Sequence, residues 1–180
     1  QKFAELCKKN NIAYRIHKDT ACTTLQELLE ETRFADLALI SSELFFATMS
    51  EAQPNASLKE VLHATECPAL LIPEKFTVPD NILLTYDGKA PSVDAIRQFS
   101  QLMPFFSYLP ASLVYVATGT GDALPSEDAI REYLSAHFSD LTITVLDEHT
   151  ETLGNWISRF PNPLLVAGAY TRSWVSLLFK

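Results

Sequence analysis

The sequence predicts an α/β protein built on parallel β-sheets. Short apolar runs rich in Leu, Val and Ile recur along the chain, and stretches with helical spacing lie between them. Strands that alternate with helices form parallel sheets with right-handed crossovers. A third observation is an internal repeat, which divides the 180 residues into two units of one kind. The chain is 47% hydrophobic, which is enough for one ordinary core or two small ones.

Seven apolar runs have the length of a β-strand. They show little alternation of polar and apolar residues, which is typical of strands covered on both faces. The predicted strands are Ile12–Ile16, Leu37–Ile40, Ala69–Ile72, Ile82–Tyr86, Leu113–Ala117, Leu141–Leu146 and Leu164–Ala167.

Helical patterns fill several of the gaps between these runs. Ser126, followed by Glu127 and Asp128, predicts a helix start, because acidic residues stabilise the positive end of a helix. Residues 58–64 are expected to form a helix before the strand at 69–72. The apolar spacing that predicts two further helices is carried by Leu25, Leu28 and Leu29, and by Ile96, Phe99 and Leu102.

The repeat joins a segment of the first half to the end of the chain. "NIAYRIHKDTACTTLQELLEETRFADLALISS" resembles "DLTITVLDEHTETLGNWISRFPNPLLVAGAY": both contain a strand, an acidic turn, a threonine, a short helix and a second strand. Ser41 aligns with Gly168, 127 positions further on. We therefore assign residues 1–74 to a first unit, 75–80 to a linker and 81–180 to a second unit.

Each unit lacks a part that the other has. The first unit has no counterpart of the strand–helix–strand pattern at 81–117, and the second has none of the strand at 69–72. A complete unit would have five strands, so the strands of the first unit are expected not to form one continuous sheet. The sequence is accordingly expected to be a piece of a two-domain protein of roughly 250 residues.

An acidic turn follows the apolar run at 82–86. Ligands of open parallel sheets bind beyond the carboxyl ends of the strands, and Asp87 lies at such an end. Its carboxylate could accept hydrogen bonds from a ribose hydroxyl or an adenine amine, while Gly88 permits a tight turn and Ser92 could cap the next helix. The alternative, that Asp87-Gly88 is only a turn, stays open.

A second candidate segment is "LLVAGAYTRSWVSLLFK", residues 164–180. After Gly168 comes a small polar loop with Thr171, Arg172 and Ser173. Backbone N–H groups in such a loop can bind phosphate, and Arg172 could pair with it. A plain connection between strand and helix is the alternative, because no Walker-type Lys-Ser/Thr follows a glycine here.

These stretches together resemble the universal stress protein family in its tandem two-domain form. The resemblance covers essentially the whole chain. It rests on "NILLTYDGKAPSVDAIRQF", the later "SLVYV", "PNPLLVAGAYTRS", "ADLALISS" and "VLHATECPALLIPE".

The resemblance implies two Rossmann-like domains of the adenine nucleotide alpha hydrolase-like kind, with parallel five-stranded sheets of order 3-2-1-4-5, each incomplete in this sequence. It also implies a homodimer or paired domains joined through the last strands. In ATP-binding members, an Asp on the first strand and a Val on the second hold the nucleoside, and a loop G-x2-G-x9-G-[ST] holds the phosphates. The matching candidates for ATP or AMP are Asp87, Val116, Gly168, Thr171, Arg172 and Ser173.

The loop departs from the family pattern. Thr171 stands at the second glycine of the second unit. In the first unit, Ser41 and Leu44 replace two glycines, Glu43 adds negative charge, and Pro54, which lacks an N–H donor, stands at the third glycine. The first unit is therefore expected not to bind ATP, which leaves the second unit as the candidate.

Composition excludes several other classes. A net charge of -8 without a basic patch argues against nucleic acid as a partner. No apolar run is long enough for a membrane span, and no signal peptide is visible. Three cysteines without metal or redox spacing fit reduced thiols in a cytoplasmic protein. The four histidines lack metal-ligand spacing, so no metal site and no catalytic residue is assigned.

Three functions remain open at this point. The first is a stress-response regulatory or sensor module that binds ATP or AMP in its second domain. The second is a family member without nucleotide that works through protein–protein contacts. The third, a nucleotide hydrolase, has the least support, because no base, nucleophile or metal cluster is evident. We therefore expect a protein that is not an enzyme.

Overall fold

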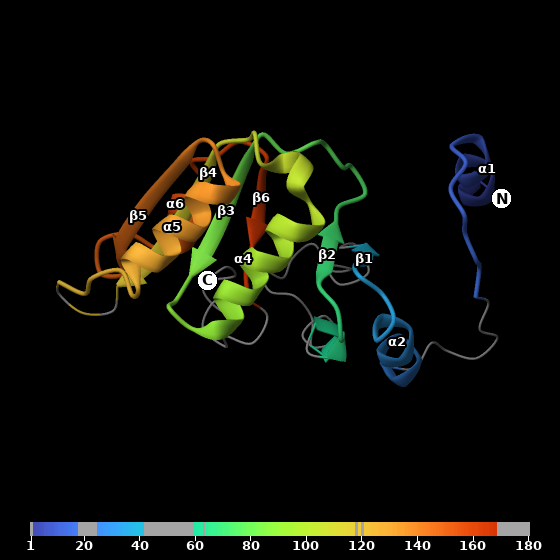
Figure 1. Ribbon diagram of the computed structural model, residues 1–180, viewed down its shortest axis with the longest axis horizontal. Helices are drawn as coiled ribbons and strands as arrows, with labels where there is room; N and C mark the ends of the chain where they lie inside the picture. Colours follow the sequence, from blue (N-terminus) through green and yellow to red (C-terminus); the bar gives the residue numbers. More distant parts are fainter. Residues whose placement is uncertain are drawn as a thin grey trace.

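The computed structural model describes residues 2–17, 25–41, 60–62, 64–117, 119 and 121–168. Within them the chain forms an α/β structure with two parallel sheets, one of four strands and one of two (Figure 1). The predicted α/β class with parallel sheets is confirmed. In these ranges no helix combines the length and the apolar character that crossing a bilayer requires.

The four-stranded sheet belongs to the second half of the chain. All three of its strand pairs are parallel, and the strand order is β5-β4-β3-β6. Its strands are β3 (Asn81–Tyr86), β4 (Ala111–Ala117), β5 (Leu141–Asp147) and β6 (Pro163–Val166). The connecting elements are α4 (Ala90–Leu102), the 3₁₀ turn η2 (Pro104–Phe106), α5 (Glu127–His137) and α6 (Leu153–Ile157).

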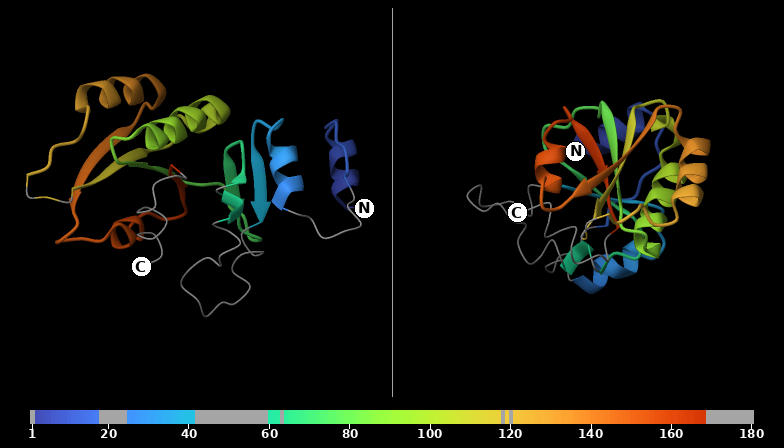
Figure 2. Two further views of the ribbon diagram at one scale, coloured as in Figure 1. Left: turned by 90° about the horizontal axis from the view of Figure 1, so that it is seen from below. Right: turned by 90° about the vertical axis from the view of Figure 1, so that its left-hand side faces the viewer.

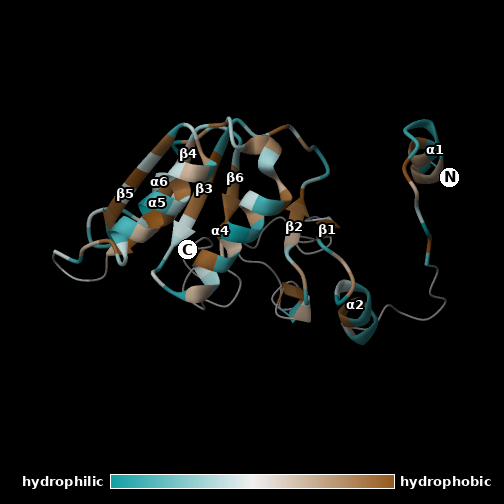
Figure 3. Ribbon diagram, in the orientation of Figure 1, coloured by the Kyte–Doolittle hydropathy of each residue, from teal (hydrophilic) through white to brown (hydrophobic). Residues whose placement is uncertain are grey.

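Helices cover both faces of this sheet, which explains the unbroken apolar strands. α4 and α5 lie on one face and α6 lies on the other (Figure 2). Ile82 and Leu84 of β3 pack with Ile96 of α4, whereas Leu83 packs with Trp156 of α6. Figure 3 shows the same distribution, since apolar residues follow the strands and hydrophilic residues are frequent on α5.

The two-stranded sheet belongs to the first half. β1 (Ala38–Ser41) pairs in parallel with β2 (Ala69–Ile72), and Ala38 lies opposite Ala69. Two helices precede it, α1 (Lys2–Lys9) and α2 (Leu25–Thr32). Leu37 and Leu70 pack against the α4-side core of the larger sheet. The two sheets therefore share a part of one apolar core.

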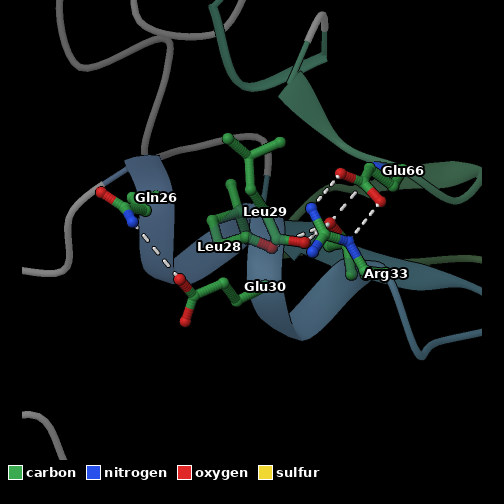
Figure 4. Close-up of polar contacts among 7 residues, drawn as sticks. Gln26, Leu28, Leu29, Glu30, Arg33 and Glu66 are labelled. Carbon is green, nitrogen blue, oxygen red and sulfur yellow. Dashed lines mark hydrogen bonds and ion pairs between the residues drawn. The ribbon is translucent and has the colours of Figure 1, made fainter.

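A side-chain pair closes the α2–β1–β2 region. Both guanidinium nitrogens of Arg33 that face Glu66 donate to its carboxylate at 2.8 Å (Figure 4). The hydrogen bond from Arg33 lowers the pKa of Glu66. The Thr32 hydroxyl bonds the Leu28 carbonyl at 2.8 Å and accepts from the Glu66 N–H at 3.3 Å. These contacts join the end of α2 to the turn before β2.

Six of the seven predicted strands are present, each within two residues of its predicted bounds. The strand predicted at 12–16 is wrong. Asn11, in a left-handed conformation with φ 53°, ends α1, and residues 12–17 then run without regular structure. A strand needs a neighbour for its backbone N–H and C=O groups, and none of the described residues pairs with this segment. The two strands that the first unit forms among its described residues, β1 and β2, pair in one sheet, so the expectation that its strands would not form one continuous sheet is not borne out.

The predicted helices at 25–29, 96–102 and 127 onward correspond to α2, α4 and α5. Of the helix predicted at 58–64, residues 60–62 and 64 are helical, and the other three lie outside the described residues.

The segment before β3 is fastened to the turn before β6. Asn162, left-handed with φ 44°, donates from Nδ2 to the Val78 carbonyl at 2.6 Å and accepts at Oδ1 from the Thr77 hydroxyl at 2.9 Å. Its own carbonyl accepts from the Asp80 N–H at 3.2 Å. Asn81 Nδ2 donates to the Pro161 carbonyl at 2.8 Å. Residues 77–80 of the predicted linker at 75–80 are thus hydrogen-bonded to the turn that precedes β6 of the larger sheet.

Candidate functional site

The candidate site lies at the carboxyl edge of the larger sheet. Tyr86 is level with Tyr115 in the β3–β4 ladder, so Asp87 and Val116 follow side by side. Leu84 is level with Val166 in the β3–β6 ladder. Two residues further along each strand, Gly168 therefore lies beside Tyr86. The structure therefore brings Asp87, Val116 and Gly168 to one edge. Thr171, Arg172 and Ser173 lie outside the described residues.

Asp87 closes a tight turn with its own carboxylate. Oδ1 lies 2.7 Å from the Ser92 hydroxyl and accepts from the Lys89 N–H at 3.0 Å. The Ser92 hydroxyl is also 2.8 Å from the Lys89 carbonyl, so its one proton has two acceptors within reach. Oδ1 thus has two donors within reach inside the turn, the Lys89 N–H and the Ser92 hydroxyl, which fix the direction of the carboxylate.

The second oxygen of this carboxylate has no hydrogen bond. Oδ2 is buried, and no donor among the described residues satisfies it. Among the described residues, the Lys89 ammonium lies 3.9 Å from Oδ2, on a largely exposed side chain. A buried carboxylate oxygen without a donor costs free energy, on the order of 1–3 kcal/mol or more. A ligand group that donates a hydrogen bond would remove this cost.

The predicted cap at Ser92 is wrong. α4 begins at Ala90, its N-cap residue is Lys89, and no side chain caps it. Pro91 lies in its first turn, and its fixed φ favours an early start of the helix. Ser92 therefore lies inside the first turn of the helix, where its hydroxyl is hydrogen-bonded to the Asp87 carboxylate and does not cap the helix.

Gly88 is required by the backbone and by its neighbour. Its φ of 77° is left-handed, and a Cβ at this position would lie 2.7 Å from the Cβ of Pro125. The Pro125 carbonyl accepts a hydrogen bond from the Tyr86 hydroxyl at 2.8 Å. Burial raises the pKa of Tyr86, so the phenol stays a donor at neutral pH. Both residues that flank Asp87 therefore contact Pro125.

Gly168 lies directly against the start of α4. A Cβ there would be 2.7 Å from the Pro91 carbonyl oxygen and 3.0 Å from the Ser92 nitrogen. Only a residue without a side chain allows this approach. Val116 is half-buried and packs on the α6 side of the sheet, near Leu83 and Val114.

The contact between Tyr86 and Pro125 has no local signal in the sequence. The two residues are 39 positions apart, and the contact arises because the chain after β4 turns back over the tip of β3. The 3.0 Å hydrogen bond from the Thr85 hydroxyl to the Val166 carbonyl could not be predicted from the sequence either, because it also joins residues that are far apart along the chain.

Other parts of the described chain offer less chemistry. No group of three or more His, Cys, Asp or Glu residues lies close enough to hold a metal ion within the ranges given above. His17 pairs with Glu31 at 2.7 Å on the surface. A cavity of about 190 Å³ between the carboxyl ends of α4 and α5 is lined by Phe99, Met103, His137 and their neighbours. It lies at the end of α4 away from Asp87.

The fold is similar to that of a known protein, although the sequence alone matches none. No family model matches the chain, and no curated protein matches it significantly. Among solved structures it is similar to a universal stress protein from Archaeoglobus fulgidus DSM 4304, with a TM-score of 0.61 and 11% sequence identity. The match covers 91% of this chain and 62% of the other, so this chain spans about three fifths of that protein. At this identity the likeness shows the fold.

Proposed function

We propose that this protein is a regulatory or sensor module of the universal stress protein type that binds an adenine nucleotide, ATP or AMP, at the tip of β3. The observation that carries the proposal is the buried Oδ2 of Asp87, which has no donor among the described residues and stands beside Val116 and Gly168. The fold of the similar stress protein supports the family assignment.

The chemistry of this edge suits a nucleoside. A ribose hydroxyl or an adenine amine would donate to Oδ2 once the groups that bury it move aside, while Oδ1 stays engaged with Ser92 and Lys89. The carboxyl edge of a parallel sheet is also where ligands of open α/β folds bind. The Ser92 hydroxyl is already bonded within the turn, and the described residues bring no cluster of metal ligands to it. The proposal is therefore binding without catalysis.

The tandem form is a part of the same proposal. In the family order 3-2-1-4-5, the numbers are strands in chain order. The sheet β5-β4-β3-β6 matches strands 3-2-1-4 of the second unit, and the pair β1-β2 matches strands 4 and 5 of the first unit. Pairing of domains through their last strands, within one chain or in a homodimer, follows as a proposal.

Nucleotide is proposed for the second unit alone. Ser41 ends β1 at the place that Gly168 occupies after β6, and its side chain would narrow the equivalent space. Glu43, Leu44 and Pro54, which the sequence marks as unfavourable for phosphate, lie outside the described residues.

A second candidate is a family member that works through protein contacts without nucleotide. The observation in its favour is that the turn already shields the Asp87 carboxylate without any ligand. Oδ2 is shielded from solvent, and Lys89 supplies a positive charge at 3.9 Å. A turn with a purely structural role would have these features as well.

Isothermal titration with ATP and AMP, with GTP as a base control, separates the two candidates. We expect one site per chain, and we expect Asp87→Asn to weaken binding by about ten- to hundredfold, the range for a hydrogen bond to a charged group. Asp94→Asn is the matched control, because Asp94 lies on α4 and pairs with exposed Arg97 at 2.6 Å. Absence of binding would favour the protein-contact module, whereas equal affinity of the wild type and Asp87→Asn would contradict the assignment of the site to Asp87.

A further inference from the structure

The Tyr86–Pro125 contact stands next to the candidate site without touching its proposed ligand atoms. Tyr86 is only 2% exposed, and its hydroxyl donates to the Pro125 carbonyl at 2.8 Å. Pro125 follows β4 and precedes α5, so the contact joins the tip of β3 to the connection beyond the neighbouring strand. Leu124, one residue earlier, is buried in the α4-side core and holds this connection down.

Asp87 needs such support, because the hydrogen bonds of its carboxylate are all local. The carboxylate accepts hydrogen bonds from Lys89 and Ser92 within the same turn. These bonds fix the shape of the turn but not its position relative to the rest of the protein. The β3–β4 ladder fixes the backbone up to Tyr86, and the position of the turn beyond it depends on other contacts. The hydroxyl of Tyr86 and the close approach of Gly88 to Pro125 are contacts that bind the turn to the chain after β4.

We propose that Tyr86 is a positioning residue, whose hydroxyl holds the Asp87 turn against the β4–α5 connection at Pro125. The inference rests on the nucleotide function proposed above and deepens it. The β3–β4 ladder fixes the backbone up to the pair Tyr86–Tyr115, and Asp87 lies one residue beyond it, so the direction of its carboxylate depends on how the turn is held. Without the hydroxyl, the close approach of Gly88 to Pro125 is the contact that remains, and the turn is held less firmly.

The test uses Tyr86→Phe, which keeps the buried ring and removes only the donor. Tyr115→Phe is the matched control, because Tyr115 is level with Tyr86 on β4 and its hydroxyl makes no hydrogen bond with the described residues. By titration calorimetry we expect Tyr86→Phe to bind ATP about fivefold more weakly than the wild type, as the loss of one neutral hydrogen bond implies. The affinity of Tyr115→Phe is expected to stay within about twofold.

A double-variant cycle shows whether Tyr86 acts through Asp87. In the Asp87→Asn background the loss caused by Tyr86→Phe is expected to disappear, because the group that it positions is already impaired. A merely structural role would lower the affinity by the same factor in both backgrounds, and that result would overturn the inference while leaving the nucleotide function intact. Failure of the wild-type protein to bind ATP would overturn both.

Hydrogen exchange on the wild-type protein provides a measurement that does not depend on the folding of any variant. If the site and the chain after β4 are coupled, we expect ATP to slow the exchange of the backbone amides of residues 121–124 and 126, which flank Pro125, itself without an N–H. Unchanged exchange at saturating ATP contradicts the inference, even where ATP itself binds.

Discussion

The two sheets of this molecule use the same parallel pairing but differ in burial. In β3, five of six residues are buried and Leu83 is wholly inaccessible, whereas β1 alternates between half-buried and exposed and Leu39 is 64% exposed. β3 has a strand on each side and helices on both faces, while β1 has one partner strand among the described residues. The comparison teaches that an apolar run specifies a strand, but its neighbours decide how much that strand stabilises the fold.

The largest predicted effect contrasts one leucine from each sheet. Leu83→Ala should destabilise the protein by about 2–5 kcal/mol, because it leaves a cavity between the sheet and α6. Leu39→Ala should change stability by less than about 0.5 kcal/mol, because the side chain is already in solvent. Urea unfolding followed by circular dichroism measures both. Equal losses would mean that β1 is covered in solution and would remove the contrast.

The next effect tests the close packing that the larger sheet shows at its carboxyl edge. Gly168→Ala should cost about 1–3 kcal/mol, because the new methyl would meet the Pro91 carbonyl at 2.7 Å. Gly154→Ala in α6 is the control, since open space surrounds the position that its methyl would take, and helix propensity favours alanine there. Thermal unfolding should therefore show a lower melting temperature for the first variant and not for the second. If both substitutions changed the melting temperature in the same direction, the backbone around Gly168 would have room for a methyl group beside α4.

The smallest effect concerns the junction between the sheets. Asn162→Gly keeps the left-handed backbone but removes the hydrogen bonds to Thr77 and Val78, so trypsin should cleave after exposed Lys75 about threefold faster. Asn11→Gly is the control, because Asn11 is also left-handed, with φ 53°, but lies in the first unit. If both variants are cleaved at the wild-type rate, the side chain of Asn162 does not hold the segment.

Much of the larger sheet could be predicted from the sequence, because its strands are continuous apolar runs separated by helical spacing. The same rule failed at residues 12–16, since an apolar run forms a strand only beside another strand. The carboxylate at the tip of β3 was also predictable, because its position follows from the end of an apolar run. The contacts around it were not. The Ser92 hydroxyl bonds to Asp87 because α4 begins three residues earlier than a cap at this serine predicts, and Pro125 contacts Tyr86 only in the folded chain.

β6 is a short strand with a fixed point at each end. Its start adjoins Asn162, to which residues 77–80 are tied, and two residues beyond its end Gly168 presses on the first turn of α4. One short run of backbone therefore joins the chain that leaves the smaller sheet to the start of the helix beside Asp87.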